Sequence, residues 1–150
     1  ILLSPTSRGR TWSLLDPGLD AGAIFEMVAW VSKKWNVDEE RVLLTGMSDG
    51  ATFSYLAAFR EGAPFTHLAP ISGVLPPLSP GSEERANGHP VYLVHGARDW
   101  MFPVQTAQMA RETLKSLGAD VTYREIADLS HTYPREENRA ILDWFGAPLS

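Results

Sequence analysis

The sequence predicts a single α/β domain built on a mostly parallel sheet with helices on both faces. Short apolar runs typical of buried strands alternate with longer segments of helical periodicity. A chain of 150 residues has the length of one domain. Its 44% of hydrophobic and 21% of charged residues are ordinary for a globular protein rather than a disordered or fibrous one. We therefore take residues 1–150 as one domain.

Short apolar runs predict strands over residues 42–44, 67–71 and 91–94, with Ile1–Leu3 read as the end of another strand. An alternating pattern predicts a strand over residues 121–126. Helices are expected over residues 21–35, 51–59, 106–117 and 136–145. Asp20 stands where the N-cap of the first helix is expected, and Gly118 ends the third. Residues 4–19 and 73–90 carry clusters of Pro and Gly and are expected to be surface loops. Because helices separate successive strands, the strands are expected to be parallel.

Composition excludes several classes of function. The net charge is -5 and no basic cluster stands out, so we expect no nucleic-acid partner. The chain has no cysteine, which excludes a disulfide framework, a thiolate zinc site and a cysteine nucleophile. The histidines lack the spacing of metal ligands, so we expect neither a metal nor a cofactor. No segment is apolar for long enough to span a bilayer, so we expect a soluble protein of the cytoplasm.

The pentapeptide Gly46-Met47-Ser48-Asp49-Gly50 has the G-x-S-x-G pattern, follows a predicted strand and opens a predicted helix. That context is typical of a nucleophile elbow, a tight strand-to-helix turn that exposes the serine hydroxyl. The glycines two residues before and after the serine remove side chains that would clash in such a turn. The turn also leaves the backbone N–H of Asp49 at a helix N-terminus, where it can stabilise an oxyanion. The alternative is a serine that only caps the helix.

A serine needs a histidine base that is oriented by a carboxylate, and in this arrangement acid and histidine follow later strands in that order. Asp99 follows the strand at 91–94 and His131 follows the strand at 121–126. Both are expected at the carboxyl ends of the strands, where open α/β sheets build their sites. Asp128 is an alternative acid and His95 an alternative base, although His95 precedes the acid and fits strand-end packing better.

These segments resemble the α/β-hydrolase fold, and within it the phospholipase/carboxylesterase family, with similarity also to the polyhydroxybutyrate depolymerase and feruloyl esterase-like group. The resemblance runs from Ile1 to the C-terminus and is carried by residues 41–50, 95–99 with Pro103, 117–119 and 130–131. It implies a catalytic triad of Ser48, Asp99 and His131, with the Asp49 N–H in the oxyanion hole.

The chain departs from the family pattern in two places. Ala51 stands where the elbow usually continues with another glycine. The family's first strands, and a loop that supplies a second oxyanion donor, would precede the position of Ile1. We therefore expect either further residues upstream or association with another chain, such as a second copy, through the N-terminal edge. The same deficit would expose the apolar helix face of Ile24, Val28 and Val31. The alternative is a minimal domain in which residues 4–19 fold over the site and supply the donor.

The sequence therefore predicts a serine carboxylesterase that hydrolyses small-molecule esters through an acyl-enzyme. Apolar and aromatic residues near the predicted triad are candidates for substrate binding, with core packing as the alternative for each: Trp12, Met47, Trp100, Met101, Phe102 and Tyr133. Two other functions stay open. One is cleavage of amides or peptides on the same triad, because a fold does not settle its substrate. The other is a non-catalytic, truncated binding module.

Overall fold

The computed structural model describes residues 1–9, 11, 12, 14 and 16–147. Within them, four strands form one sheet in the order β1-β2-β3-β4. The strands are β1 (Leu43–Met47), β2 (His67–Ile71), β3 (Pro90–Gly96) and β4 (Asp120–Ile126). All three pairings are parallel, so the predicted α/β class is confirmed.

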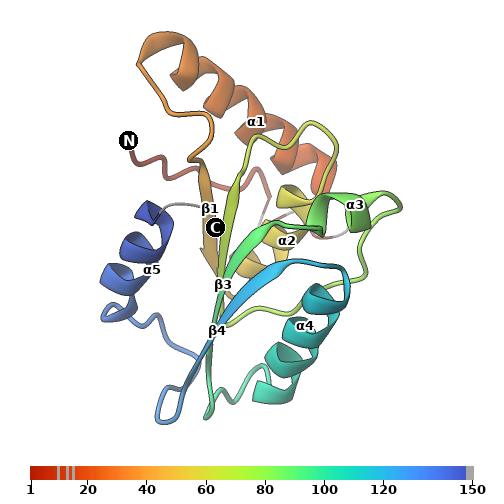
Figure 1. Cartoon of the computed structure of the whole chain (residues 1–150), viewed down its shortest axis with the longest axis vertical. Helices are drawn as coiled ribbons and strands as arrows, with labels where there is room; N and C mark the ends of the chain where they lie inside the picture. Colours follow the sequence, from red (N-terminus) through yellow and green to blue (C-terminus); the bar gives the residue numbers. More distant parts are fainter. Residues whose placement is uncertain (10, 13, 15, 148–150) are drawn as a thin grey trace.

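Helices cover both faces of the sheet (Figure 1). One face is covered by α5 (Glu137–Gly146). The other face is covered by α2 (Asp49–Ala58) and α4 (Val104–Ser116), and α1 (Pro17–Lys34) packs against α2. The connection between β2 and β3 contains the short helix α3 (Ser82–Ala86), so the predicted loop over residues 73–90 is interrupted by one helical turn.

The two inner strands are buried on both faces, which explains their continuous apolar sequences. Leu68 and Leu93 belong to the larger core cluster, on the side of α2 and α4. Ala69 and Val94 belong to the smaller cluster, on the side of α5. Along β4, exposed and half-buried side chains alternate, as expected for an edge strand. Since neighbouring residues of β2 and of β3 belong to different clusters, successive side chains of these strands point to opposite faces of the sheet. This alternation determines what surrounds each side chain near the carboxyl ends of the strands.

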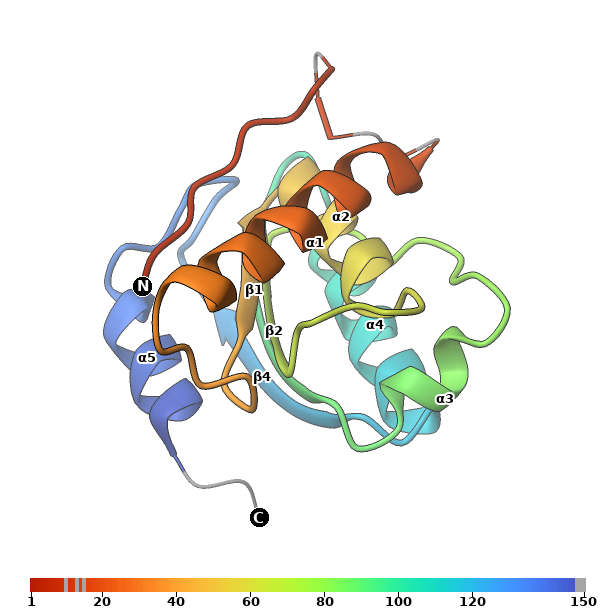
Figure 2. The ribbon, with the colours of Figure 1, turned by 90° about the horizontal axis from the view of Figure 1, so that it is seen from above.

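The prediction of a strand at Ile1–Leu3 is wrong. These residues have no regular secondary structure, and the side chains of Ile1 and Leu2 are 82% and 91% exposed. In Figure 2 the segment from Ile1 to Gly9 runs outside the sheet. A strand needs a neighbouring strand for its backbone hydrogen bonds, and β1 pairs only with β2 among the described residues. Three apolar residues alone do not supply that partner.

The first helix begins earlier than expected, at Pro17, with Asp16 in the N-cap position. Asp20 is therefore not the N-cap but lies in the first turn of α1, where it is buried. Its carboxylate accepts hydrogen bonds from the hydroxyl of Ser7 at 3.1 Å and from the backbone N–H of Arg8 at 3.0 Å. This buried acid thus anchors the N-terminal segment on α1.

The prediction of an exposed apolar face on the first helix is also wrong. Ile24 and Val28 pack in the larger core cluster, and Val31 is buried as well. Trp30 and Trp35 lie on the opposite, exposed side and contact each other edge to face. Across the described part of the chain, no helix is long and apolar enough to cross a membrane.

Candidate active site

The elbow around Ser48 is a one-residue turn between β1 and α2. The backbone φ angle of Ser48 is 59°, a left-handed conformation that costs a non-glycine residue free energy. A Cβ atom on Gly46 would lie 2.5 Å from both the carbonyl carbon and oxygen of Gly50, closer than such atoms can approach. The glycine spacing is therefore a steric requirement of this turn, as the pentapeptide predicted.

The segment that follows β2 supports the elbow from the neighbouring strand. The backbone N–H of Ser48 donates to the carbonyl oxygen of Ile71 at 3.0 Å. A Cβ atom on Gly73 would lie 2.5 Å from the Cβ of Ala51 and 3.0 Å from the carbonyl oxygen of Ser48. The elbow and the end of β2 thus pack with almost no free space between them, which fixes the nucleophile's backbone.

Three side chains from three loops meet at the carboxyl end of the sheet. The Nε2 atom of His131 lies 3.0 Å from the hydroxyl oxygen of Ser48, and its Nδ1 atom lies 2.8 Å from Oδ2 of Asp99. Because an ionised carboxylate can only accept, Nδ1 carries the proton, and Nε2 is left to accept the hydroxyl proton of Ser48. The side chains of His131 and Asp99 are 9% and 0% exposed, so little solvent reaches this pair. The structure brings Ser48, Asp99 and His131 together in the predicted order.

Asp99 is held by its own loop as well as by the histidine. Its Oδ1 atom accepts backbone N–H groups from Met101 at 2.9 Å and Phe102 at 2.8 Å. Burial disfavours the ionised carboxylate, but the Phe102 N–H, the His131 hydrogen bond and the Met101 N–H outweigh it, so the pKa of Asp99 lies below its ordinary value. Asp99 is therefore charged at neutral pH and is oriented by three hydrogen bonds.

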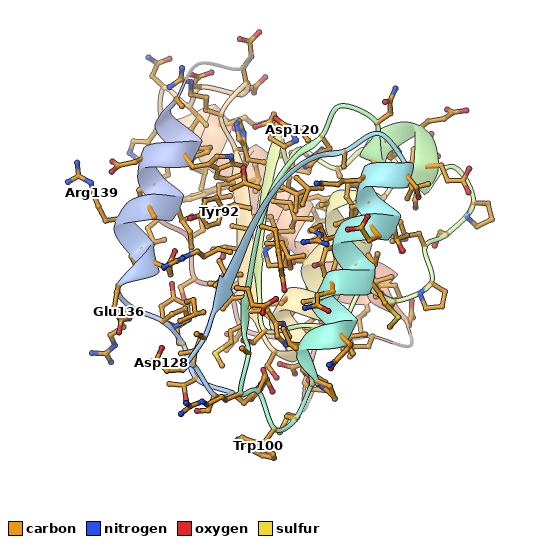
Figure 3. All side chains as sticks on the ribbon, turned by 60° about the horizontal axis from the view of Figure 1, so that its bottom comes forward. Tyr92, Trp100, Asp120, Asp128, Glu136 and Arg139 are labelled. Carbon is orange, nitrogen blue, oxygen red and sulfur yellow. The ribbon has the colours of Figure 1, made fainter. Side chains whose placement is uncertain are left out.

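The two alternative residues occupy different places. His95 is fully buried, and its Nε2 atom lies 2.9 Å from the carbonyl oxygen of Phe102, so it does not face the nucleophile. Nε2 also lies 3.6 Å from Oδ2 of Asp99, which is a contact rather than a hydrogen bond. Asp128 is exposed at the same end of the sheet as Trp100 (Figure 3). The Nδ1 atom of His131, which an orienting acid would have to bond, is already bonded to Asp99. Neither alternative is supported by this geometry.

Asp49 is the first residue of α2, so its backbone N–H has no partner within the helix. Its side-chain Oδ1 accepts the neighbouring N–H of Gly50 at 2.9 Å. The carboxylate thus bonds within the first turn of α2, and the Asp49 N–H stands at the helix N-terminus directly after Ser48. This is the position that the sequence assigned to an oxyanion donor.

Aromatic rings line one side of the histidine. Phe102 and Trp100 both meet the His131 ring edge to face, with ring centroids 5.4 Å and 6.1 Å away. Trp100 is 73% exposed and projects from the loop after β3 (Figure 3). Met101 and Tyr133 are exposed as well, and the Tyr133 hydroxyl donates to Asn138 at 2.6 Å. Four of the six predicted substrate-binding residues therefore lie on the two loops that carry the acid and the histidine.

The other two candidates pack elsewhere. Met47 packs against the smaller core cluster, on the α5 side of the sheet. Trp12 stacks on Phe53 with ring centroids 4.8 Å apart, and its Nε1 atom would lie 3.2 Å from a Cβ on Gly50. The N-terminal segment thus reaches the second glycine of the elbow, and its supply of a second oxyanion donor stays a prediction. Of the rest of residues 4–19, positions 10, 13 and 15 lie outside the described residues.

Sequence reasoning missed two contributors to this geometry, the backbone N–H groups at 101 and 102 and the ring of His95. The signal for the first was present, since Asp99 followed by a short loop and Pro103 is typical of a carboxylate that accepts nearby backbone N–H groups. For His95, no local pattern distinguishes packing from hydrogen bonding. Among the described residues, no group of three His, Asp or Glu side chains is placed to hold a metal ion.

Comparisons with known proteins agree with the fold. The chain is 29% identical over 119 residues to the bifunctional acetylxylan esterase/xylanase XynS20E of Neocallimastix patriciarum, covering 79% of this chain but only 17% of that protein. Acyl-protein thioesterase 2 from Zea mays superposes with a TM-score of 0.71 at 20% identity, covering 98% of this chain and 71% of that one. A carboxylesterase from Bacillus cereus superposes with a TM-score of 0.70 at 16% identity, covering 89% and 62%.

The chain therefore spans about one sixth of the curated relative that it matches. At these identities the two superposed structures establish the α/β-hydrolase fold and nothing finer. Residues 20–146 match the family model described as phospholipase/carboxylesterase, which includes the elbow and the loops of Asp99 and His131. This protein belongs to the phospholipase/carboxylesterase family.

Proposed function

We propose that this chain carries the catalytic centre of a serine esterase, with Ser48 as nucleophile, His131 as general base and Asp99 as the acid that orients it. The observation that carries the proposal is the continuous hydrogen-bonded array from Asp99 Oδ2 through His131 to Ser48 Oγ. Such an array activates a hydroxyl that is otherwise a poor nucleophile at neutral pH.

In the acylation half of the reaction, Ser48 Oγ attacks the ester carbonyl carbon while its proton passes to Nε2 of His131. The carbonyl oxygen becomes an oxyanion and accepts the Asp49 N–H at the start of α2, where the helix dipole also favours negative charge. The carbon–oxygen bond to the alcohol then breaks, and His131 returns the proton to the departing oxygen. Acylated Ser48 and the free alcohol remain.

In the second half, a water molecule takes the place of the alcohol. His131 accepts a proton from the water as its oxygen attacks the acyl carbon, and the bond to Ser48 Oγ breaks as the proton is returned to that oxygen. Asp99 remains ionised throughout and stabilises the imidazolium that forms twice per turnover. Its lowered pKa, caused by the hydrogen bonds that outweigh burial, suits this role.

The substrate class follows from the surroundings of His131. The rings of Trp100 and Phe102, with Met101 beside them, form an apolar wall next to the base, and Tyr133 lies on the same loop as His131. An apolar acyl or alcohol group would lose water-exposed surface against this wall. Trp12 and Met47 are assigned a supporting role behind the elbow, because both are partly buried in core contacts. The similar proteins are esterases and a thioesterase by name, which favours an oxygen or sulfur leaving group over an amine.

The first test is covalent labelling of the chain by a fluorophosphonate. Wild type should be labelled and Ser48→Ala should not, while Ser116→Ala, which removes an exposed hydroxyl at the end of α4, should label like wild type. Hydrolysis rates over a series of p-nitrophenyl esters of rising acyl length, with the matched p-nitroanilides, then identify the leaving group and the acyl preference. A folded wild-type chain that is never labelled would instead support the non-catalytic alternative.

A further inference from the structure

Two buried polar atoms beside the triad have no hydrogen-bond partner among the described residues, Nδ1 of His95 and Oγ of Ser72. Both residues are 0% exposed. A buried polar group without a partner costs about 1–3 kcal/mol, so two of them in one place call for an explanation. Neither group is used by the proposed reaction.

The two residues stand at the carboxyl ends of neighbouring strands, β2 and β3. Ile71 of β2 is paired with Val94 of β3, and Ser72 and His95 are the next residue of each. The backbone N–H of Ser72 donates to the carbonyl oxygen of Val94 at 2.9 Å, which keeps the two strand ends together. By alternation from Leu93, which belongs to the larger core cluster, His95 faces the side of α2 and α4.

The hydrogen-bonding needs of the two groups are complementary. The carbonyl oxygen of Phe102 can only accept, so the 2.9 Å contact requires that Nε2 of His95 carries the proton. In the neutral ring Nδ1 is then an acceptor with no donor. The hydroxyl of Ser72 is a donor with no acceptor. Its backbone φ angle of 48°, unusual for a residue other than glycine, marks a position held by its surroundings.

His95 holds the residue on which both the acid and the base depend. The N–H of Phe102 donates to Asp99, and the ring of Phe102 packs against His131. The carbonyl group of the same residue is held by His95. A shift of Phe102 would therefore move Asp99 and His131 together, and a misplacement of about 1 Å at a catalytic group can cost about 100-fold in rate.

We propose that His95 is a positioning residue of the triad, which locks the turn at residues 99–102 through Phe102, and that one bound water joins the Ser72 hydroxyl to its second nitrogen. The inference rests on the proposed function, because the turn matters only if Asp99 and His131 are catalytic. It assigns a role to a buried histidine that makes no contact with the substrate. It also gives a role to the buried hydroxyl of the residue that follows β2.

The test uses two substitutions that keep different halves of the ring. In His95→Gln the side-chain amide nitrogen can replace Nε2, whereas in His95→Asn it reaches only the position of Nδ1. We expect His95→Asn to lower kcat and the rate of fluorophosphonate labelling roughly 10- to 100-fold, with KM little changed. His95→Gln should remain within about threefold of wild type. The matched control is His89→Asn, at the opposite end of β3, which should label like wild type.

A second variant tests the contribution of Ser72. Ser72→Ala should slow labelling in the wild-type background but have no further effect in His95→Gln, which lacks the acceptor nitrogen. Equal effects of Ser72→Ala in both backgrounds would overturn the assigned pairing. Loss of activity of equal size in His95→Asn and His95→Gln would overturn the positioning role, because both remove the ring but only one removes the donor to Phe102.

A spectroscopic measurement separates this inference from the proposed function. The proton between His131 Nδ1 and Asp99 should give a far-downfield proton NMR signal, and that signal should weaken or shift in His95→Asn but persist in His95→Gln. If the signal of wild type weakens or shifts in His95→Asn and persists in His95→Gln, yet wild type is not labelled, the proposed function fails and the positioning of Asp99 and His131 by His95 stands. An unchanged signal in folded His95→Asn would overturn the inference whatever the activity.

Discussion

Replacing Asp99 by asparagine tests how the acid controls the protonation state of the histidine. Oδ1 of Asp99 accepts two backbone N–H groups, from Met101 and Phe102. In Asp99→Asn the amide oxygen must keep this place, because an NH2 group there would face two donors. The NH2 group then occupies the position of Oδ2 and points at Nδ1 of His131.

This orientation reverses the ring's tautomer. An amide donor at Nδ1 makes that nitrogen an acceptor, so the proton moves to Nε2, the atom 3.0 Å from Ser48 Oγ. A protonated Nε2 cannot take the hydroxyl proton. We expect kcat to fall by about 10⁴, equivalent to about 5.5 kcal/mol of transition-state stabilisation. Both backbone hydrogen bonds survive, so the free energy of unfolding should change by less than about 1 kcal/mol.

The assay is p-nitrophenyl ester hydrolysis with the fluorophosphonate labelling rate measured in parallel, and urea unfolding as the stability check. Asp143→Asn is the matched control, since it removes an exposed carboxylate that pairs with Arg139 on α5. Its activity should equal that of wild type. If folded Asp99→Asn keeps more than about 1% of wild-type kcat, the tautomer argument is refuted.

Three other outcomes are expected. Gly46→Ala should lose about 3 kcal/mol or more of unfolding free energy in urea, because its Cβ would lie 2.5 Å from the backbone of Gly50; unchanged stability would contradict the steric account of the elbow. Burial, and secondarily the charge of His67, lowers the pKa of His89 to about 4. Between about pH 4 and pH 6.5, His89 is therefore neutral in the folded protein but binds a proton in the unfolded chain. The free energy of unfolding should therefore be highest above about pH 6.5 and fall by up to about 3 kcal/mol as the pH drops toward 4. In His89→Phe, the free energy of unfolding should depend less on pH over this range. Trp100→Ala should raise KM for esters with long acyl chains roughly tenfold, equivalent to about 1.4 kcal/mol of binding free energy. Its kcat and its free energy of unfolding should stay near those of wild type. An equal rise of KM for acetyl esters would argue against an apolar wall.

Local sequence predicted the parts of this protein that depend on a few neighbouring residues. The strands at residues 67–71 and 121–126 are found within a residue of their predicted bounds, because an apolar run and an alternating pattern are both local signals of a strand. The elbow was readable because its glycines meet a steric demand that acts within five residues. That Ser48, Asp99 and His131 lie at one edge of the sheet could be predicted, because each follows a strand and parallel strands bring their carboxyl ends to the same edge.

The remaining features depend on contacts between distant residues. Apolar periodicity identified the first helix, but whether Ile24 and Val31 are covered was decided by α2 and the core. Ile1–Leu3 has the composition of a strand but no partner to pair with. The hydrogen bonds of His131, 2.8 Å and 3.0 Å long, join residues that are 32 and 83 positions apart in the chain. Sequence alone determined which residue types stand at the end of the sheet, because backbone sterics and periodicity are local. Only the tertiary structure decided which of them touch, because hydrogen-bond distances depend on how whole elements pack.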